Sequence, residues 1–313
     1  MAINISSLST YVDEQRLPLL RNAVLGARTA YHFNLMTGVK GATALNLLTT
    51  NVQFGDGSAC GWNEAGASTL SQRTLTPGAI KINMSFCDKQ LLKTWMNYDV
   101  RVAAGQKTLP FEEDFMKGVG ESIASKLEVA LWQGDKSTSN SNANTNKFDG
   151  IIKIADAATL ASTVTYASGA TVTSIVNDVY KAIPSAAFSK GEVVLYMGAD
   201  SYRAYIQELI ANGNLVITSG LQDVAMPDSV LIPGTNVRVI YVDGLNGTGR
   251  YFASYKDNFI YGVDMTEDEE KYDFWYSQDN REHRLAVEFV AGVQIAFPDM
   301  VVTAKQQTAQ SQS

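Results

Sequence analysis

The sequence contains few of the residues from which catalytic and metal sites are usually built. Its 313 residues include two cysteines, two histidines and seven prolines. Cys60 and Cys87 form no CxxC pattern, so they provide neither a disulfide framework nor a cysteine-rich zinc site. His32 and His283 lie far apart in the sequence and belong to no HExxH motif. We therefore expect no metal centre and no cofactor.

Charge and long apolar runs are also scarce. Charged residues make up 18% of the chain, against roughly a quarter in typical soluble domains. The formal net charge of −7 opposes sequence-independent binding to phosphate backbones, which argues against a dedicated DNA or RNA reader. No run approaches the roughly 18 uncharged apolar residues of a membrane-spanning helix, and the N-terminus lacks the pattern of a signal peptide. The sequence thus predicts no membrane partner.

Motifs for nucleotide binding and nucleophilic catalysis are incomplete. The stretch Gly55–Gly61 misses GxGxxG because Cys60 occupies the third glycine position. The segment 187–191 lacks the first glycine of a nucleophile elbow and precedes a strand, where the elbow requires a strand before it. The acidic cluster 264–273 lacks the spaced ligands of a calcium loop. We expect no catalytic residues and no enzyme, and a cytosolic hydrolase using Cys60 or Ser189 stays as a remote alternative.

The most regular feature present is a long amphipathic helix predicted over residues 111–133. Pro110 is well placed to open it, and the helix would span roughly 35 Å at 1.5 Å per residue. Gly118 and Gly120 lower its helix propensity, which suggests that another segment packs closely there. The apolar side chains recur every four residues along one stripe, and the predicted core positions are Phe115, Val119, Ile123, Leu127 and Leu131.

Strand patterns alternate with helical ones without a regular βαβα rhythm. Val193 to Met197 is a continuous apolar strand, and Asp200 is predicted to cap the helix that follows it. Tyr251 to Val263 indicates a further strand or a hairpin. Since 45% of the residues are hydrophobic, the chain can build one large core or two interlocked ones. The predicted fold class is α+β.

Residues 52–86 do not fit a self-contained domain. They form an extended two-stranded excursion with a glycine-rich outgoing side and an alternating returning side. Two isolated strands bury too little surface to offset their ordering entropy, so the excursion needs a further surface. The alternative is a hairpin folded back onto its own sheet. The candidate contacts with a neighbouring subunit are Phe54, Trp62, Ile80, Ile82 and Met84.

The order of these parts resembles the major capsid proteins of tailed double-stranded DNA phages, which have the Hong Kong 97-like fold. The resemblance includes Trp132-Gln133-Gly134-Asp135 after the long helix, a variable loop, and Phe148-Asp149-Gly150-Ile151. In that family such a passage links the spine helix to the axial domain. The closing segment from Phe274 to Ala304 resembles the terminal strands of the peripheral domain. Each motif alone is weak, and the resemblance rests on their order over nearly the whole chain.

The resemblance implies a division of the chain into arm, loop and two domains. The peripheral domain would contain the spine helix, and the axial domain would lie near the symmetry axes of a capsomer. The implied segments are an N-terminal arm 1–51, an extended loop 52–86, a peripheral domain 87–147 with spine helix 111–133, an axial domain 148–251, peripheral strands 252–304 and a C-terminal tail 305–313.

The function implied is that of a structural protein. Copies of the chain would self-associate into hexamers and pentamers of an icosahedral phage head, which is assembled in the host cytoplasm. The head would enclose double-stranded DNA, and the protein would contact this DNA non-specifically. The implied partners include the portal and other head proteins. Fewer than 60 residues precede the loop, so we expect a separate scaffolding protein or none, and no N-terminal maturation cleavage. An encapsulin-type bacterial compartment is the alternative with the same architecture.

Overall fold

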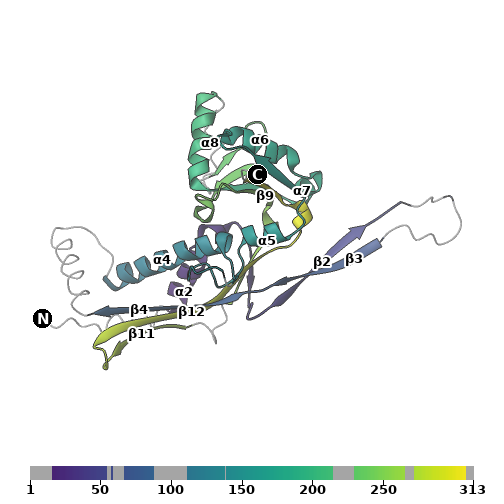
Figure 1. Cartoon of the computed structure of the whole chain (residues 1–313). Coiled ribbons are helices and arrows are strands. Elements are labelled where there is room, and N and C mark those ends of the chain that lie inside the picture. The colour runs from purple at the N-terminus through teal and green to yellow at the C-terminus, as the bar shows by residue number, and fades with distance from the viewer. Residues whose placement is uncertain are drawn as a thin grey trace.

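Two β-sheets, one above the other, form the body of the protein, and a two-stranded hairpin projects from it (Figure 1). The five-stranded sheet carries the longest helix, α4, and the six-stranded sheet carries α6, α7 and α8. The computed structural model describes residues 16–54, 58, 67–87, 111–137, 139–213, 229–264 and 271–307. Within these residues, none of the helices is both long and apolar enough to span a bilayer.

The five-stranded sheet is organised around one long strand, β12. Leu285 of β12 pairs with strands on both sides, since its partners are Met84 of β4 and Phe274 of β11. Ala291 likewise pairs with Gly78 of β4 on one side, and with β10 on the other. The strands are β1 (Asn34–Thr37), β4 (Gly78–Cys87), β10 (Phe259–Val263), β11 (Lys271–Ser277) and β12 (Glu282–Ile295).

The helix α4 (Phe111–Gln133) covers one face of this sheet, with α2 (Arg16–Leu25) packed beside it (Figure 1). Alternate residues of β12 are buried, which explains its alternating sequence. The observed bounds of α4 are those predicted from its apolar stripe. Pro18 lies in the first turn of α2, where a missing backbone N–H leaves no intrahelical bond unmade.

The six-stranded sheet has helices on one face and the end of α4 on the other. The strand β6 lies between these layers, and all five of its residues are buried, which explains its unbroken apolar run. The strand order is β5 (Ser162–Tyr166), β13 (Val302–Gln306), β9 (Tyr251–Tyr255), β6 (Val193–Met197), β8 (Arg238–Tyr241) and β7 (Ser229–Leu231). Its accompanying helices are α6 (Val172–Ala182), α7 (Ser185–Lys190) and α8 (Ala199–Ala211), whereas α5 (Ile151–Ala157) packs on α4 and β12.

Aromatic rings join the two sheets into one core. Trp132 at the end of α4 lies 5.5 Å from Tyr196 of β6 and 5.6 Å from Phe252 of β9, measured between ring centroids. Phe33 stacks on Phe259 of β10 at 5.1 Å. Short 3₁₀ turns connect the layers: η1 (Arg28–Tyr31), η2 (Asp243–Leu245), η3 (Lys256–Asn258) and η4 (Pro298–Met300). The two sheets therefore share one aromatic cluster.

The projecting hairpin consists of β2 (Thr43–Asn51) and β3 (Ala67–Leu75). The sequence predicted an excursion over residues 52–86, whereas β2 lies in the segment expected to be the N-terminal arm. The predicted return side, β4, pairs along its whole length with β12 of the same chain. Residues 78–87 thus belong to the chain's own sheet, as in the folded-back alternative, because their alternating apolar positions match the buried positions of β12.

The segment Tyr251–Val263 is neither one strand nor a hairpin. Its two strands, β9 and β10, belong to different sheets and are separated by η3. Buried Asn258 holds this corner: its side chain donates to the carbonyl of Phe297 at 2.9 Å and accepts from the Phe297 N–H at 2.7 Å. The expected boundary at residue 252 falls inside β9, and β13 also lies in the six-stranded sheet, because strand periodicity does not specify which sheet a strand joins.

One local expectation about a helix was wrong, and another finds no support within the described residues. Gly198, not Asp200, is the N-cap of α8; Asp200 lies in the first turn, and its carboxylate accepts from the N–H of Gly247 at 3.1 Å. Outside its own helix, no atom of the described residues lies within 4 Å of the position that a Cβ would take at Gly118 or Gly120. Close packing at these glycines is therefore not made by the described residues and stays a prediction.

Candidate assembly surfaces

The inner end of the hairpin is anchored to the body by a small apolar cluster. Leu45 of β2 and Leu75 of β3 are buried together with Val39. Gly262 of β10 lies against Leu75 so closely that a Cβ there would be 2.9 Å from a Leu75 methyl group. The hairpin is thus fixed at its root, and its two strands extend away from the sheet (Figure 1).

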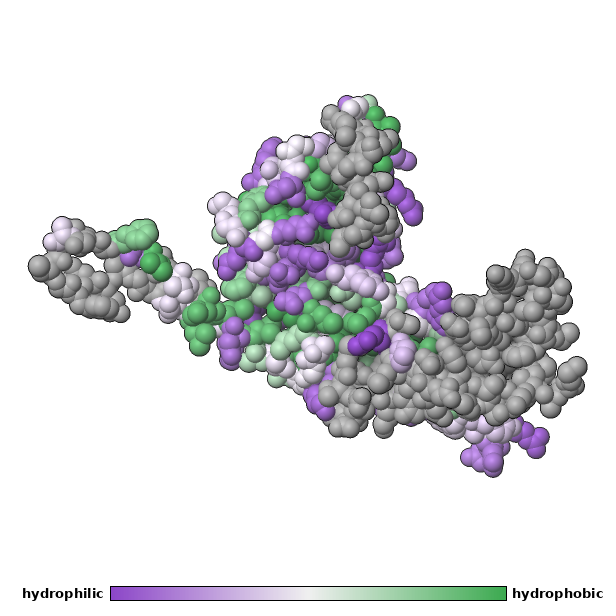
Figure 2. Space-filling view, turned by 180° about the vertical axis from the view of Figure 1, so that it is seen from behind, coloured by the Kyte–Doolittle hydropathy of each residue, from purple (hydrophilic) through white to green (hydrophobic). Residues whose placement is uncertain are grey.

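The outer half of the hairpin exposes large apolar side chains. Leu48 and Leu70 are directly opposite in the register, and they are 62% and 70% exposed. Val52 and Phe54, which follow β2, are exposed as well. Figure 2 shows hydrophobic residues on this projecting element, away from the body of the protein. Several large apolar side chains exposed on one projecting element are typical of an interaction surface.

The residues predicted to contact a neighbour fall into three groups. Phe54 is fully exposed beyond the end of β2, and Met84 is 38% exposed on β4. Ile80 and Ile82 are half-buried and pack against the main core, so they stabilise the subunit itself. Trp62 lies outside the described residues. Contact with a neighbour stays a prediction for all five.

Sequence reasoning missed Leu48 and Leu70. The segment 43–51 was expected to belong to the arm because the family resemblance implied it, and its leucines at 45, 47 and 48 follow neither a strict strand period nor a helical one. A usable signal existed in the Thr-rich ends of both strands, since Thr is favoured on pleated surfaces. The pairing of the two strands was not visible in either one alone.

The predicted stripe of α4 faces the core. Val119, Ile123, Leu127 and Leu131 are buried in the cluster that also contains the inward residues of β12. The side chain of Phe115 lies outside what the structure describes. The stripe thus packs α4 onto the five-stranded sheet, and Trp132 at its end reaches the six-stranded sheet.

The motif after α4 is a close crossing of two backbone segments. Gly150 donates its N–H to the carbonyl of Gly134 at 2.8 Å. A methyl group at position 134 would lie 2.6 Å from the carbonyl oxygens of Ala130 and Phe148, so glycine is required there. Lys153 bonds Asp135, and it bonds Asp149 at 2.8 Å. The end of α4 is thereby tied to α5, the helix that carries Lys153.

A buried carboxylate fastens the segment after α2 to the spine helix. Glu128 of α4 accepts from the Thr29 N–H at 2.8 Å and also from the Thr29 hydroxyl. Trp132 donates its indole N–H to the same hydroxyl oxygen at 2.7 Å. Burial raises the pKa of Glu128, while the bonds from Thr29 act in the opposite direction. The cluster fixes η1 on α4 through a buried network of hydrogen bonds.

His32 is buried among cations next to this clamp. Burial, followed by the positive charges of Lys256, Arg28 and Arg238, lowers its pKa to about 4. Glu192 is the carboxylate that acts in the opposite direction. The imidazole ring of His32 meets the ring of Tyr196 edge-on, with 6.3 Å between the ring centroids. Because its pKa is lowered, the imidazole is an uncharged part of the core at neutral pH.

The described chain shows no arrangement of catalytic groups. Ser189 is exposed on α7, and its hydroxyl bonds the carbonyl of Ser185 at 3.4 Å rather than a base. Cys60 lies outside the described residues. Across the described ranges, no three His, Cys, Asp or Glu side chains gather as a metal site.

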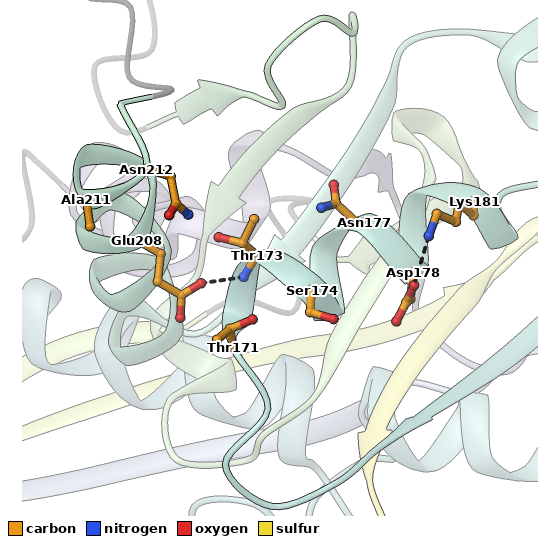
Figure 3. A pocket seen from close by; sticks show the side chains of 9 residues that line it. All are labelled: Thr171, Thr173, Ser174, Asn177, Asp178, Lys181, Glu208, Ala211 and Asn212. Atoms are coloured by element: carbon orange, nitrogen blue, oxygen red, sulfur yellow. Dashed lines mark hydrogen bonds and ion pairs between the residues drawn. The ribbon is translucent and has the colours of Figure 1, made fainter.

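An open polar pocket lies between α6 and α8 (Figure 3). Two backbone N–H groups at the start of α6, a helix that borders the pocket, already have an acceptor within the chain. The carboxylate of Glu208 accepts from the N–H groups of Val172 and Thr173 at 2.9 and 2.6 Å. Lys181 in turn bonds Asp178 at 3.3 Å. The N-terminal end of α6 therefore offers little to an added anion.

Comparison with solved structures assigns this architecture. A chain of the satellite phage P4 procapsid matches with a TM-score of 0.63 at 10% identity, covering 93% of this chain and 91% of that one. A chain of Gordonia phage Cozz matches with a TM-score of 0.56 at 11% identity, covering 90% and 86%. The chain has the Hong Kong 97-like capsid fold. The fold class and the resemblance expected from the order of sequence motifs are thus confirmed.

A third solved structure with a similar fold is a virus-like particle. The virus-like particle from Pyrococcus furiosus matches with a TM-score of 0.52 at 12% identity, covering 93% of this chain and 98% of that one. No protein-family model matches the sequence, and no curated protein matches it either. The likeness is therefore one of fold, carried by nearly the whole length of the chain.

Proposed function

We propose that the protein is the major capsid protein of a tailed phage, which self-assembles into hexamers and pentamers of an icosahedral head around double-stranded DNA. The capsid fold supports this proposal. The observation that carries it is the rigidly rooted hairpin with Leu48 and Leu70 exposed, because a projecting apolar surface is stable in water only when another surface covers it.

In this proposal each segment of the fold has its own place in the assembled shell. The sheet of β12 and its spine helix form the peripheral domain, and the six-stranded sheet forms the axial domain, whose copies converge within a capsomer. The extended loop is the hairpin of β2 and β3, so it begins at residue 43 rather than 52, and β4 belongs to the peripheral domain. Residues before β2 act as the N-terminal arm.

Further partners belong to the same proposal. A portal and other head proteins, together with a separate scaffolding protein or none, complete the head in the host cytoplasm. Packaged DNA meets the shell without sequence readout, since the net charge of −7 would oppose tight binding of a phosphate backbone. The protein acts by assembly and not by chemical catalysis.

An encapsulin-type compartment is the second candidate, favoured by the likeness to the virus-like particle. The two functions differ in what the shell contains. A compartment would hold cargo enzymes, bound in a groove lined by the N-terminal helix, whereas a phage head would hold DNA.

Electron microscopy of the purified protein tests the proposal. We expect closed shells or isolated capsomers, and particles isolated from cells that carry the full set of phage genes should protect DNA from nuclease. A chain that stays monomeric at high concentration, with or without scaffolding proteins, would contradict both candidates. Shells that retain a protein cargo and no DNA would favour the compartment.

A further inference from the structure

Arg73 occupies an unusual place at the root of the projecting hairpin. It lies on β3 directly opposite buried Leu45, and its side chain is half-buried. It is the only cationic residue on the described part of the hairpin, residues 43–54, 58 and 67–75. The other described residues of the hairpin are apolar or are polar without a charge.

The hydrogen bonds available to this guanidinium within the chain are poor. One terminal nitrogen, Nη2, donates to Oε1 of Gln294 at 3.4 Å, a long bond to a neutral acceptor. The same Oε1 also accepts from the N–H of Ile295 at 3.0 Å. The Nε atom is buried and has no acceptor among the described residues. Burial lowers the pKa of Arg73, in line with a cation that has lost water without gaining a negative partner.

Other arginines of the described chain are better satisfied. Arg238 bonds Glu192 at 2.9 Å, Arg284 bonds Glu282 at 3.2 Å, and Arg250 bonds Asp156. Carboxylate is the acceptor that matches the planar donors of a guanidinium, and a half-buried charge without one is unfavourable. Among the described residues, Arg73 thus lacks the partner type that Arg238, Arg250 and Arg284 have.

Gln294 holds Arg73 at a defined place. Its Nε2 donates to the carbonyl of Thr74, next to Arg73, at 2.6 Å. This bond ties β3 to β12, so the backbone that carries Arg73 is held against the five-stranded sheet. The Arg73 side chain is only half-buried, so part of it stays accessible to a partner.

We propose that Arg73 binds a carboxylate of a second copy of this chain when subunits assemble. This inference rests on the proposed function. Carboxylates are in excess, with 32 Asp and Glu against 25 Lys and Arg, so a neighbouring copy can readily supply one. A nucleic acid backbone fits less well, because it is bound by several cations in a row and the described hairpin carries one.

The first experiment measures assembly against salt. We expect Arg73→Gln to raise the critical concentration for assembly at physiological salt by about tenfold or more. Raising the NaCl concentration should weaken assembly of the unaltered protein more than that of the variant. Lys126→Gln is the matched control: it removes one exposed positive charge from α4 and should change the critical concentration less than twofold.

The second experiment identifies the partner. Arg73→Lys provides an amine at the same position, which carbodiimide joins to a carboxylate that it already contacts. Shells assembled from equal amounts of ¹⁴N-labelled and ¹⁵N-labelled Arg73→Lys chains should yield a crosslinked peptide of mixed isotope, with position 73 joined to an Asp or Glu. The peptide joined to position 73 identifies the Asp or Glu of the neighbouring copy that Arg73 contacts.

Defined outcomes would overturn the proposal. Normal assembly of Arg73→Gln at all salt concentrations would do so while leaving the capsid function intact. A crosslink confined to one isotope would show an intramolecular partner. Loss of salt-dependent DNA retention with unchanged shell formation would assign Arg73 to nucleic acid. Failure of the unaltered chain to associate under any condition would remove the capsid function and the inference together.

Variant stability is measured on unassembled protein. Arg73→Gln removes an incompletely bonded charge, so its thermal midpoint should equal or exceed that of the unaltered chain. A midpoint that falls for both Arg73→Gln and Arg73→Lys would mean that Arg73 stabilises the subunit itself, which contradicts the proposal.

Discussion

Leu48 and Leu70 face each other across the two strands of the hairpin, and both are more than half exposed. Their neighbours on the same face are polar, including the Asn46–Gln72 pair, whose side chains bond at 3.1 Å. A two-stranded element of this kind gains little from its own burial, so the leucines contribute most when a neighbouring subunit covers them.

We predict that the double variant Leu48→Ser/Leu70→Ser folds but does not assemble. Each leucine that is covered on assembly contributes about 1.5–3 kcal/mol, so the double change should abolish capsomers at working concentrations. The free energy of unfolding of the subunit should change by less than about 0.5 kcal/mol, as is usual for exposed positions. Sedimentation velocity and urea unfolding measure the two quantities.

The control is Thr50→Ala/Ser68→Ala, the next cross-strand pair along the same face. It should assemble like the unaltered chain, because it changes two small polar side chains and no apolar one. Capsomers of normal stability formed by the double serine variant would show that the hairpin face is not an interface.

The glycine crossing after α4 predicts opposite effects of the same substitution at two positions. Gly134→Ala should lower the free energy of unfolding by about 2–3 kcal/mol, since its methyl group would overlap backbone atoms of Ala130 and Phe148. Gly118→Ala, on the exposed side of α4 with nothing within 4 Å, should raise it by about 0.5–1 kcal/mol. Chemical unfolding of the unassembled variants provides both values.

The contrast between these two variants is the decisive measurement. A Gly134→Ala chain as stable as the unaltered one would mean that the segments do not cross as described. A destabilising Gly118→Ala in the isolated subunit would mean that another part of the chain packs on α4 there.

His32 predicts a pH dependence of stability. Its pKa in the folded chain is about 4, against 6.5 in the unfolded chain, so the unfolded state binds more protons between these values. Stability should therefore fall as the pH decreases from about 6.5 to about 4, by about 3 kcal/mol in total from this residue. Below pH 4 this contribution should not decrease further.

The matched variants are His32→Phe and Val242→Ala. His32→Phe keeps a ring beside Tyr196 and should lose this part of the pH dependence in urea titrations at pH 7, 5.5 and 4.5. Val242→Ala, a buried change in the same cluster, should lower stability by a similar amount at every pH. An unchanged pH profile in His32→Phe would contradict the assignment of a neutral, buried His32.

Local patterns determined the elements whose stabilising contacts are close in sequence. Pro110 and Gly134 predicted the two ends of α4, and the apolar stripe predicted its buried face, because a helix presents residues four apart on one face. The run Val193–Met197 predicted β6 for the same local reason, since a strand buried on both sides has no polar positions. The order of such elements also carried the resemblance to the capsid fold.

Tertiary structure decided which strands pair, and with that which surfaces are left uncovered. Ile80 of β4 and Leu48 of β2 are both apolar residues on strands. The strand β4 pairs with β12, whereas nothing in the described chain covers Leu48 on β2. Pairing partners more than 200 residues apart, such as Ile82 and Val287, leave no mark in either segment alone. The sequence by itself determined the α+β elements, whereas long-range pairing, which depends on complementary surfaces meeting in three dimensions, decided which hairpin projects.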